Sequence, residues 1–188
     1  KKTSPGESLI LKRYGPSGHA GGTALPCAVF FFGGGWNGGY IEHFAPQAEY
    51  LAQRGMVAIC AQYRTLNSHS VPPNVCLVDA KSAIRYVKAN AESLGIDPQR
   101  LAVGGGSAGG HLAASVTLLP NKSITQAPAG MLLFNPAVDI GRSTRIQEMF
   151  RNQAEQYSPI EYVRPSLPGA WIVHGNADEI VPYSTVVD

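Results

Sequence analysis

Short runs of apolar residues alternate along the chain with amphipathic stretches. The longest apolar run, Ala24–Phe32, leads into a glycine triplet, and shorter runs cover Met56–Ala61 and Leu101–Val103. Continuous apolar runs of this length are typical of strands that are buried on both faces of a sheet. Val75–Leu94 instead repeats apolar residues along one stripe, which predicts a helix, and Gly95 follows as its C-terminal stop.

The alternation continues on both sides of these segments. Ser8–Tyr14 and Ala129–Asn135 predict strands, Ala170–His174 predicts a last buried strand, and His43–Arg54 predicts a helix. Strands that alternate with helices predict an α/β fold with a mostly parallel sheet and helices on both faces. The 188 residues fit a single domain. Within it, Pro136–Pro168 is polar and long enough to overhang a site, so it is a candidate lid or insertion.

Composition and charge narrow the class of protein. The formal net charge is only +2 and no basic cluster occurs, so nothing predicts a nucleic-acid partner. No apolar run approaches the roughly 20 residues that span a membrane. Lys1–Pro5 lacks the hydrophobic core of a signal peptide, which fits a cytoplasmic chain or a mature secreted one. Cys27 and Cys60 lie in predicted strands as buried thiols, and Cys76 adds no metal-binding or disulfide spacing.

A glycine cluster connects the strand at Leu101–Val103 to an amphipathic stretch. Gly105–Gly109 fits the pattern G-x-S-x-G, which is typical of a nucleophile elbow. In such a turn the serine, here Ser107, is held in a strained conformation at the carboxyl edge of the sheet and at the positive end of a helix. The glycines two residues before and after it allow the strand and the helix to approach closely.

The same glycines allow other interpretations. Gly104, Gly106 and Gly109 also match the G-x-G-x-x-G of dinucleotide-binding loops. That motif requires an acidic residue about 20 positions later, and no Asp or Glu occurs between Asp97 and Asp139. A phosphate-binding loop is disfavoured because no Gly-Lys-Ser/Thr follows. The remaining alternative is a glycine-rich turn with an incidental serine.

A serine nucleophile needs donors for the oxyanion that forms in the reaction. Gly34 and Gly35, in the loop after the longest apolar run, can bring their N–H groups close to a substrate oxygen, and Gly33 is the next candidate. The N–H of Ala108, directly after the nucleophile, is the other predicted donor. The alternative for the glycine triplet is a turn that requires only positive φ angles.

A serine nucleophile also needs a base and an acid that orients the base. Asp178, in the loop after the last predicted strand, is the predicted acid, with Glu179 and Asp139 as alternatives. No histidine follows Asp178. His174 is interpreted as a hydrogen-bonded loop anchor, and His111 as a residue that packs against the sheet. The other three are interpreted as surface residues: His19, His43 and His69.

Together these segments resemble an α/β-hydrolase of the hormone-sensitive-lipase-like esterase/lipase family, in the branch near bacterial carboxylesterases and acetyl- or feruloyl-esterases. The resemblance extends from about Ser8 to Val187. It is carried by five segments: Phe32–Trp36, Gln62–Arg64, Asp79–Arg85, Gly105–Leu112 and His174–Pro182.

The resemblance implies a role for each matched residue. Ser107 is the implied nucleophile and Asp178 the acid of the triad. The implied oxyanion hole consists of Gly34, Gly35 and Ala108. The implied reaction is hydrolysis of short-chain or carbohydrate-linked acyl esters through an acyl-enzyme, without a metal or an organic cofactor. The implied partner is a small-molecule ester.

The chain departs from the family in two places. Phe32 stands where the family has a histidine that shapes the glycine loop, so we expect a changed loop anchor rather than a loss of activity. The family's last strand, last helix and catalytic histidine have no counterpart, so we expect domain 1–188 to be C-terminally incomplete, with the histidine beyond Asp188. Two alternatives stay open: an amidase, formamidase or peptidase on the same scaffold, and a non-catalytic ligand-binding homologue, as the gibberellin receptors are within this family.

Overall fold

The structure, a computed structural model, describes residues 8–19, 23–120, 126–141 and 143–187. The expectation for Lys1–Pro5 lies outside these residues. Six strands form one sheet in the order β1-β3-β2-β4-β5-β6. β1 is antiparallel to β3, and every other neighbouring pair is parallel. The strands are β1 (Leu11–Tyr14), β2 (Leu25–Phe31), β3 (Val57–Ala61), β4 (Ile96–Gly106), β5 (Gly130–Phe134) and β6 (Gly169–Val173).

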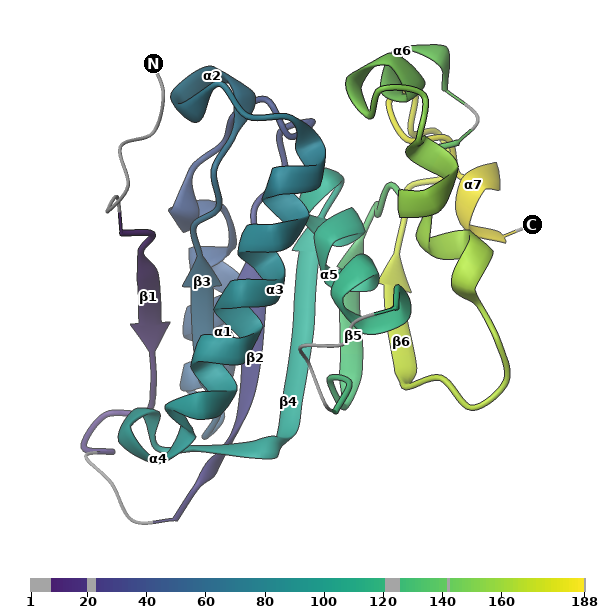
Figure 1. Ribbon diagram of the computed structural model, residues 1–188. Helices are drawn as coiled ribbons and strands as arrows, with labels where there is room; N and C mark the ends of the chain where they lie inside the picture. The colour runs from purple at the N-terminus through teal and green to yellow at the C-terminus, as the bar shows by residue number, and fades with distance from the viewer. Residues whose placement is uncertain (1–7, 20–22, 121–125, 142, 188) are drawn as a thin grey trace.

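Helices lie on both faces of this sheet (Figure 1). One face carries α1 (Ala45–Ala52), which follows the 3-10 turn η1 (Ile41–Phe44), and the other face carries α3 (Pro73–Ala89) and α5 (Ala108–Leu118). This arrangement confirms the predicted α/β class with a mostly parallel sheet. The shorter elements are α2 (Leu66–His69), α4 (Ala91–Leu94), α6 (Thr144–Met149), η2 (Ala154–Tyr157), η3 (Pro159–Tyr162) and α7 (Ser184–Val187).

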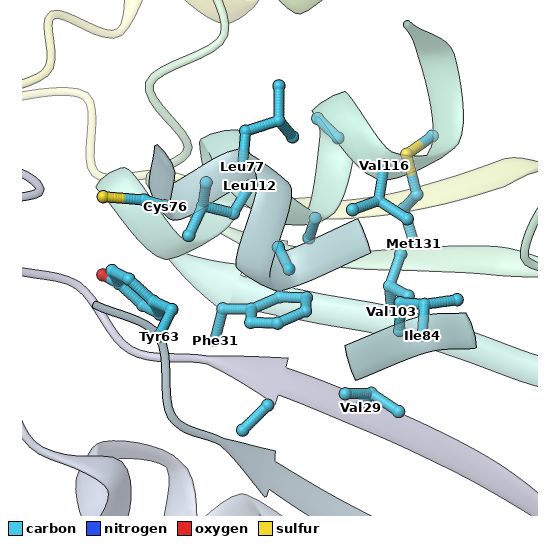
Figure 2. Packing of buried hydrophobic residues seen from close by; sticks show 14 of the residues in the cluster. Val29, Phe31, Tyr63, Cys76, Leu77, Ile84, Val103, Leu112, Val116 and Met131 are labelled. Atoms are coloured by element: carbon cyan, nitrogen blue, oxygen red, sulfur yellow. The ribbon is translucent and has the colours of Figure 1, made fainter. Parts of the chain in front are cut away.

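The core is divided between the two faces because successive side chains of a strand point in opposite directions. In β2, Val29 and Phe31 belong to the large cluster beneath α3 and α5, whereas Ala28 and Phe30 belong to the smaller cluster beneath α1. Figure 2 shows side chains of the large cluster, with Leu112 of α5 above the strands. The apolar run of β2 is therefore buried on both sides. Its parallel pairing with β4 places the carboxyl ends of the two strands next to each other.

One sequence prediction needs correction. The run Ala170–His174 predicts a buried strand, but all residues of β6 are exposed, including Trp171 and Ile172. An apolar run records a preference for burial and does not specify what covers the strand; β6 pairs only with β5 among the described strands. Within the described ranges, no helix combines the length and apolar character needed to cross a bilayer.

Candidate functional site

Ser107 lies at the turn between β4 and α5, with φ 52° and ψ −119°. A positive φ is uncommon outside glycine and stores strain where the surroundings impose it. Here the Ser107 N–H donates to Phe134 O at 3.0 Å, and Ser107 O accepts from the N–H groups of His111 and Ala137. These bonds fix the residue at the carboxyl edge of the sheet. Ala108 is the first residue of α5, so its N–H belongs to the donors that have no acceptor within the helix.

Gly105 and Gly109 bring the strand and the helix together around this serine. A Cβ added at Gly109 would lie 2.1 Å from the backbone oxygen of Phe31, and one at Gly105 would lie 2.5 Å from the same atom. Real Cβ atoms do not approach a carbonyl oxygen this closely, so both positions require glycine. The close approach places the N-terminus of α5 directly against the end of β2, where the glycine loop begins.

The loop after β2 carries Gly34 and Gly35 with φ angles of 131° and 61°, which favour glycine. A Cβ at Gly34 would lie 2.1 Å from Gly38 O. Gly33 differs from its neighbours because its N–H donates to Nδ1 of His43 at 3.3 Å. Among the described residues, the N–H groups of Gly34 and Gly35 donate to no acceptor. These two amides are therefore available to a substrate oxygen, and the Gly33 amide is already engaged.

An aromatic pair anchors the start of the glycine loop. The ring of Phe32 stacks on that of Tyr63, with centroids 4.0 Å apart, and the Tyr63 hydroxyl donates to Phe32 O at 2.7 Å. Both side chains are buried. Next to Tyr63, the Arg64 guanidinium binds both carboxylate oxygens of Asp79, at 2.8 and 2.7 Å. The loop after β3 thus holds the loop after β2 through Tyr63. The ion pair of Arg64 with Asp79 connects the loop after β3 to α3.

A cavity of about 300 Å³ opens beside Ser107. Phe44 and Phe134 form part of its apolar wall, and the side chains of His43 and Gln47 also line it. His43 is exposed, as the sequence interpretation has it, and it also lies at the candidate site and binds the glycine loop. No local sequence pattern signals this role, because it depends on η1 folding back towards Gly33.

A second cavity is larger, at about 560 Å³, but it lies away from this chemistry. It is bounded by residues of β1, β3 and α3, among them Leu11, Ile59 and Tyr86. Its lining is mostly apolar and includes no residue of the glycine loop or of the β4–α5 turn. The smaller cavity is the better candidate for a substrate because it contains the strained serine.

Asp178 is held in the loop after β6. One carboxylate oxygen, Oδ1, accepts from the N–H groups of Ile180 and Val181, both at 2.9 Å. These bonds, first that from Val181 and then that from Ile180, hold the pKa of the Asp178 carboxyl below its usual range. His174 Nε2 lies 3.6 Å from the other oxygen, Oδ2. Asp178 is therefore an ionised group in a fixed orientation near neutral pH.

The histidines of the chain are placed differently from one another. His174 is 2% exposed, and its Nε2 lies 2.7 Å from Val181 O, which makes it a loop anchor. His111 is fully buried, with both ring nitrogens in hydrogen bonds. His19 lies 3.2 Å from Gly95 O and His69 accepts from the Thr65 N–H, both far along the chain from Ser107. The expectation of a catalytic histidine beyond Asp188 stays a prediction.

Comparison with known proteins places this geometry among esterases. Residues 14–136 match the profile of the BD-FAE family. Esterase LipC of Mycobacterium tuberculosis is 30% identical over 189 residues, and the match covers 84% of this chain and 45% of the relative. The probable carboxylic ester hydrolase LipM of the same organism is 27% identical, with 80% of this chain and 40% of the relative covered. The chain thus spans less than half the length of these two relatives.

Solved structures are similar over nearly the whole chain. The apo form of Thermogutta terrifontis esterase 2 is 39% identical with a TM-score of 0.91, covering 98% of this chain and 73% of that one. The same esterase with bound propionate gives 38% identity and a TM-score of 0.89. That esterase has also been solved with butyrate bound and phosphonylated by sarin. The fold of this chain is therefore the α/β-hydrolase fold.

Proposed function

Because the chain belongs to the BD-FAE family of α/β-hydrolases, we propose that it carries the nucleophile and the oxyanion hole of a serine carboxylesterase. The observation that supports this most directly is the position of Ser107, strained at the N-terminus of α5 and beside the unengaged amides of Gly34 and Gly35. Phosphonylation of a related esterase by sarin supports serine chemistry in relatives of this fold.

In the proposed reaction, Ser107 Oγ attacks the ester carbonyl while a base takes the hydroxyl proton. The N–H groups of Gly34, Gly35 and Ala108 stabilise the negative charge that develops on the carbonyl oxygen. Collapse of this intermediate releases the alcohol, which receives the proton, and leaves an acyl group on Ser107. Water then attacks the acyl-enzyme and releases the carboxylic acid. Asp178 orients the base, a histidine that we place beyond Asp188.

We propose that the acyl groups are short. The cavity beside Ser107 has about 300 Å³ and is lined in part by Phe44 and Phe134, and this volume suits a few carbon atoms better than a fatty chain. Propionate and butyrate complexes of the Thermogutta esterase support this size class. Carbohydrate-linked esters of short acids remain within the proposal, since the sugar would lie outside the cavity. Pro136–Pro168 is proposed as the cover of the site.

The decisive experiment is an intact mass spectrum before and after treatment with a fluorophosphonate. The measurement uses the natural protein at its full length, because the proposed base lies outside residues 1–188. We expect one adduct on that protein, no adduct on its Ser107→Ala variant, and an unchanged adduct on the control Ser93→Ala, an exposed serine in α4. A folded full-length protein without an adduct would contradict the proposal and favour a ligand-binding homologue. A labelled chain that cleaves a butyryl anilide faster than p-nitrophenyl butyrate would favour an amidase.

A further inference from the structure

The side chain of His111 connects three segments that meet behind the candidate site. His111 lies in α5, one turn after Ser107, and is fully buried. The indole N–H of Trp36 donates to Nδ1 at 3.2 Å, and Nε2 lies 2.8 Å from Tyr157 O. Trp36 belongs to the glycine loop, and Tyr157 belongs to η2 in Pro136–Pro168. One imidazole therefore bridges the oxyanion loop, the nucleophile helix and the candidate lid.

These partners determine the protonation of the ring. An indole nitrogen only donates, so Nδ1 must be an unprotonated acceptor. The proton of the neutral ring is then on Nε2, where it is donated to the Tyr157 carbonyl. Both nitrogens are engaged and the ring has no access to solvent, so His111 is not available as the base for Ser107. Its chemistry is that of a fixed donor and acceptor.

The backbone conformation of the glycine loop indicates what the hydrogen bonds of His111 do. Trp36 directly follows Gly35 and has a φ of 59°, which is uncommon for a residue with a large side chain. Its indole is held by the bond to His111 and by edge contacts with the rings of His111 and Phe150, with centroids 5.1 and 5.3 Å apart. Such a conformation persists only when its surroundings impose it. The indole of Trp36 therefore connects the glycine loop to α5.

We propose that His111 is a positioning residue: through Trp36 it sets the Gly34 and Gly35 amides relative to Ser107, and through Tyr157 it locks Pro136–Pro168 onto the same helix. This assignment rests on the proposed function, because it concerns the same site. Because His111 belongs to α5, the helix that directly follows Ser107, the glycine loop and the nucleophile are both positioned by the same helix. An apolar residue of similar size would fill the space but would leave the indole N–H and the Tyr157 carbonyl unpaired.

The first test is the rate of fluorophosphonate labelling at Ser107 in the natural protein at its full length. We expect His111→Leu to lower the maximal rate of inactivation about 10- to 100-fold, the scale for a displaced oxyanion donor, while the concentration for half-maximal rate changes little. His111→Gln, which keeps an acceptor and a donor, should recover part of that rate. The matched control is Thr117→Val, which removes a buried hydroxyl bonded to Ala113 O of the same helix. A folded His111→Leu chain that labels at the wild-type rate would overturn the proposal.

A second readout does not depend on activity. In amide and indole NMR spectra, we expect the Trp36 indole proton to exchange faster in His111→Leu and the Gly34 and Gly35 amides to shift more than in Thr117→Val. Trp171→Phe distinguishes the indole signals of Trp36 and Trp171, the two tryptophans of residues 1–188. If the fluorophosphonate labels neither the wild type nor any variant, the proposed function fails. Shifted Gly34 and Gly35 amides would still support the positioning role of His111. Unshifted glycine amides in folded His111→Leu and His111→Gln would overturn it. If His111→Leu does not fold, the same measurements on His111→Gln decide.

Discussion

At the scale of single residues, Gly109 controls how closely β2 and α5 meet at the candidate nucleophile. A side chain there would have to displace backbone atoms of Phe31 and Phe32, which are less able to move than side chains. We expect Gly109→Ala to lower the free energy of unfolding by roughly 2 kcal/mol or more, despite the better helix propensity of alanine. Urea unfolding followed by circular dichroism measures this change.

Gly169 provides the matched control for that substitution. A Cβ at Gly169 meets no atom within 4 Å, and its φ is not in the left-handed region. Gly169→Ala should therefore change the free energy of unfolding by less than about 0.5 kcal/mol. Equal losses in both variants would show that the approach of β2 and α5 does not determine the stability of the turn.

At the scale of elements, the ion pair between Arg64 and Asp79 ties the end of β3 to α3. The Asp79 side chain is 6% exposed, and one of its oxygens also accepts the Arg64 backbone N–H at 3.0 Å. We expect Asp79→Ala to cost about 2 kcal/mol, below the range for a fully buried pair because Arg64 is 30% exposed. Asp97→Ala, which breaks a more exposed pair with Arg100, should lower the free energy of unfolding less than Asp79→Ala does. Thermal unfolding of both variants would reveal the difference, and similar costs would contradict a structural role for Asp79.

The elements also show how far the sequence alone could lead. The strands of the sheet centre and the β4–α5 turn were predictable because their signals are local: an apolar run, then glycines at fixed spacing around Ser107. The exposure of β6 was not predictable from the sequence, because it depends on which elements lie next to the strand. The contact of His43 with Gly33 and the bridge at His111 were not either, since each joins segments distant in sequence whose meeting is set by the whole fold.

At the scale of the whole molecule, His111 couples stability to pH. Burial lowers the pKa of this imidazole to about 4, against the opposing effect of its bond to the Tyr157 carbonyl. The unfolded chain, with a histidine pKa near 6.5, therefore binds a proton that the folded chain excludes. Stability from this group is complete above about pH 6.5 and falls as the pH decreases towards 4.

The expected size of this effect is about 2 kcal/mol between pH 7 and pH 4.5. Carboxylates titrate over part of the same range, so the wild-type curve alone does not isolate it. His111→Gln keeps every other titratable group and removes this one, so its free energy of unfolding should decrease less between pH 7 and pH 4.5. Urea unfolding at five pH values measures both curves. Parallel curves would contradict this prediction, because they would mean that the buried ring of His111 accepts a proton as readily as it does in the unfolded chain. The hydrogen bonds of the ring argue against such protonation, since a proton on Nδ1 would face the indole N–H of Trp36.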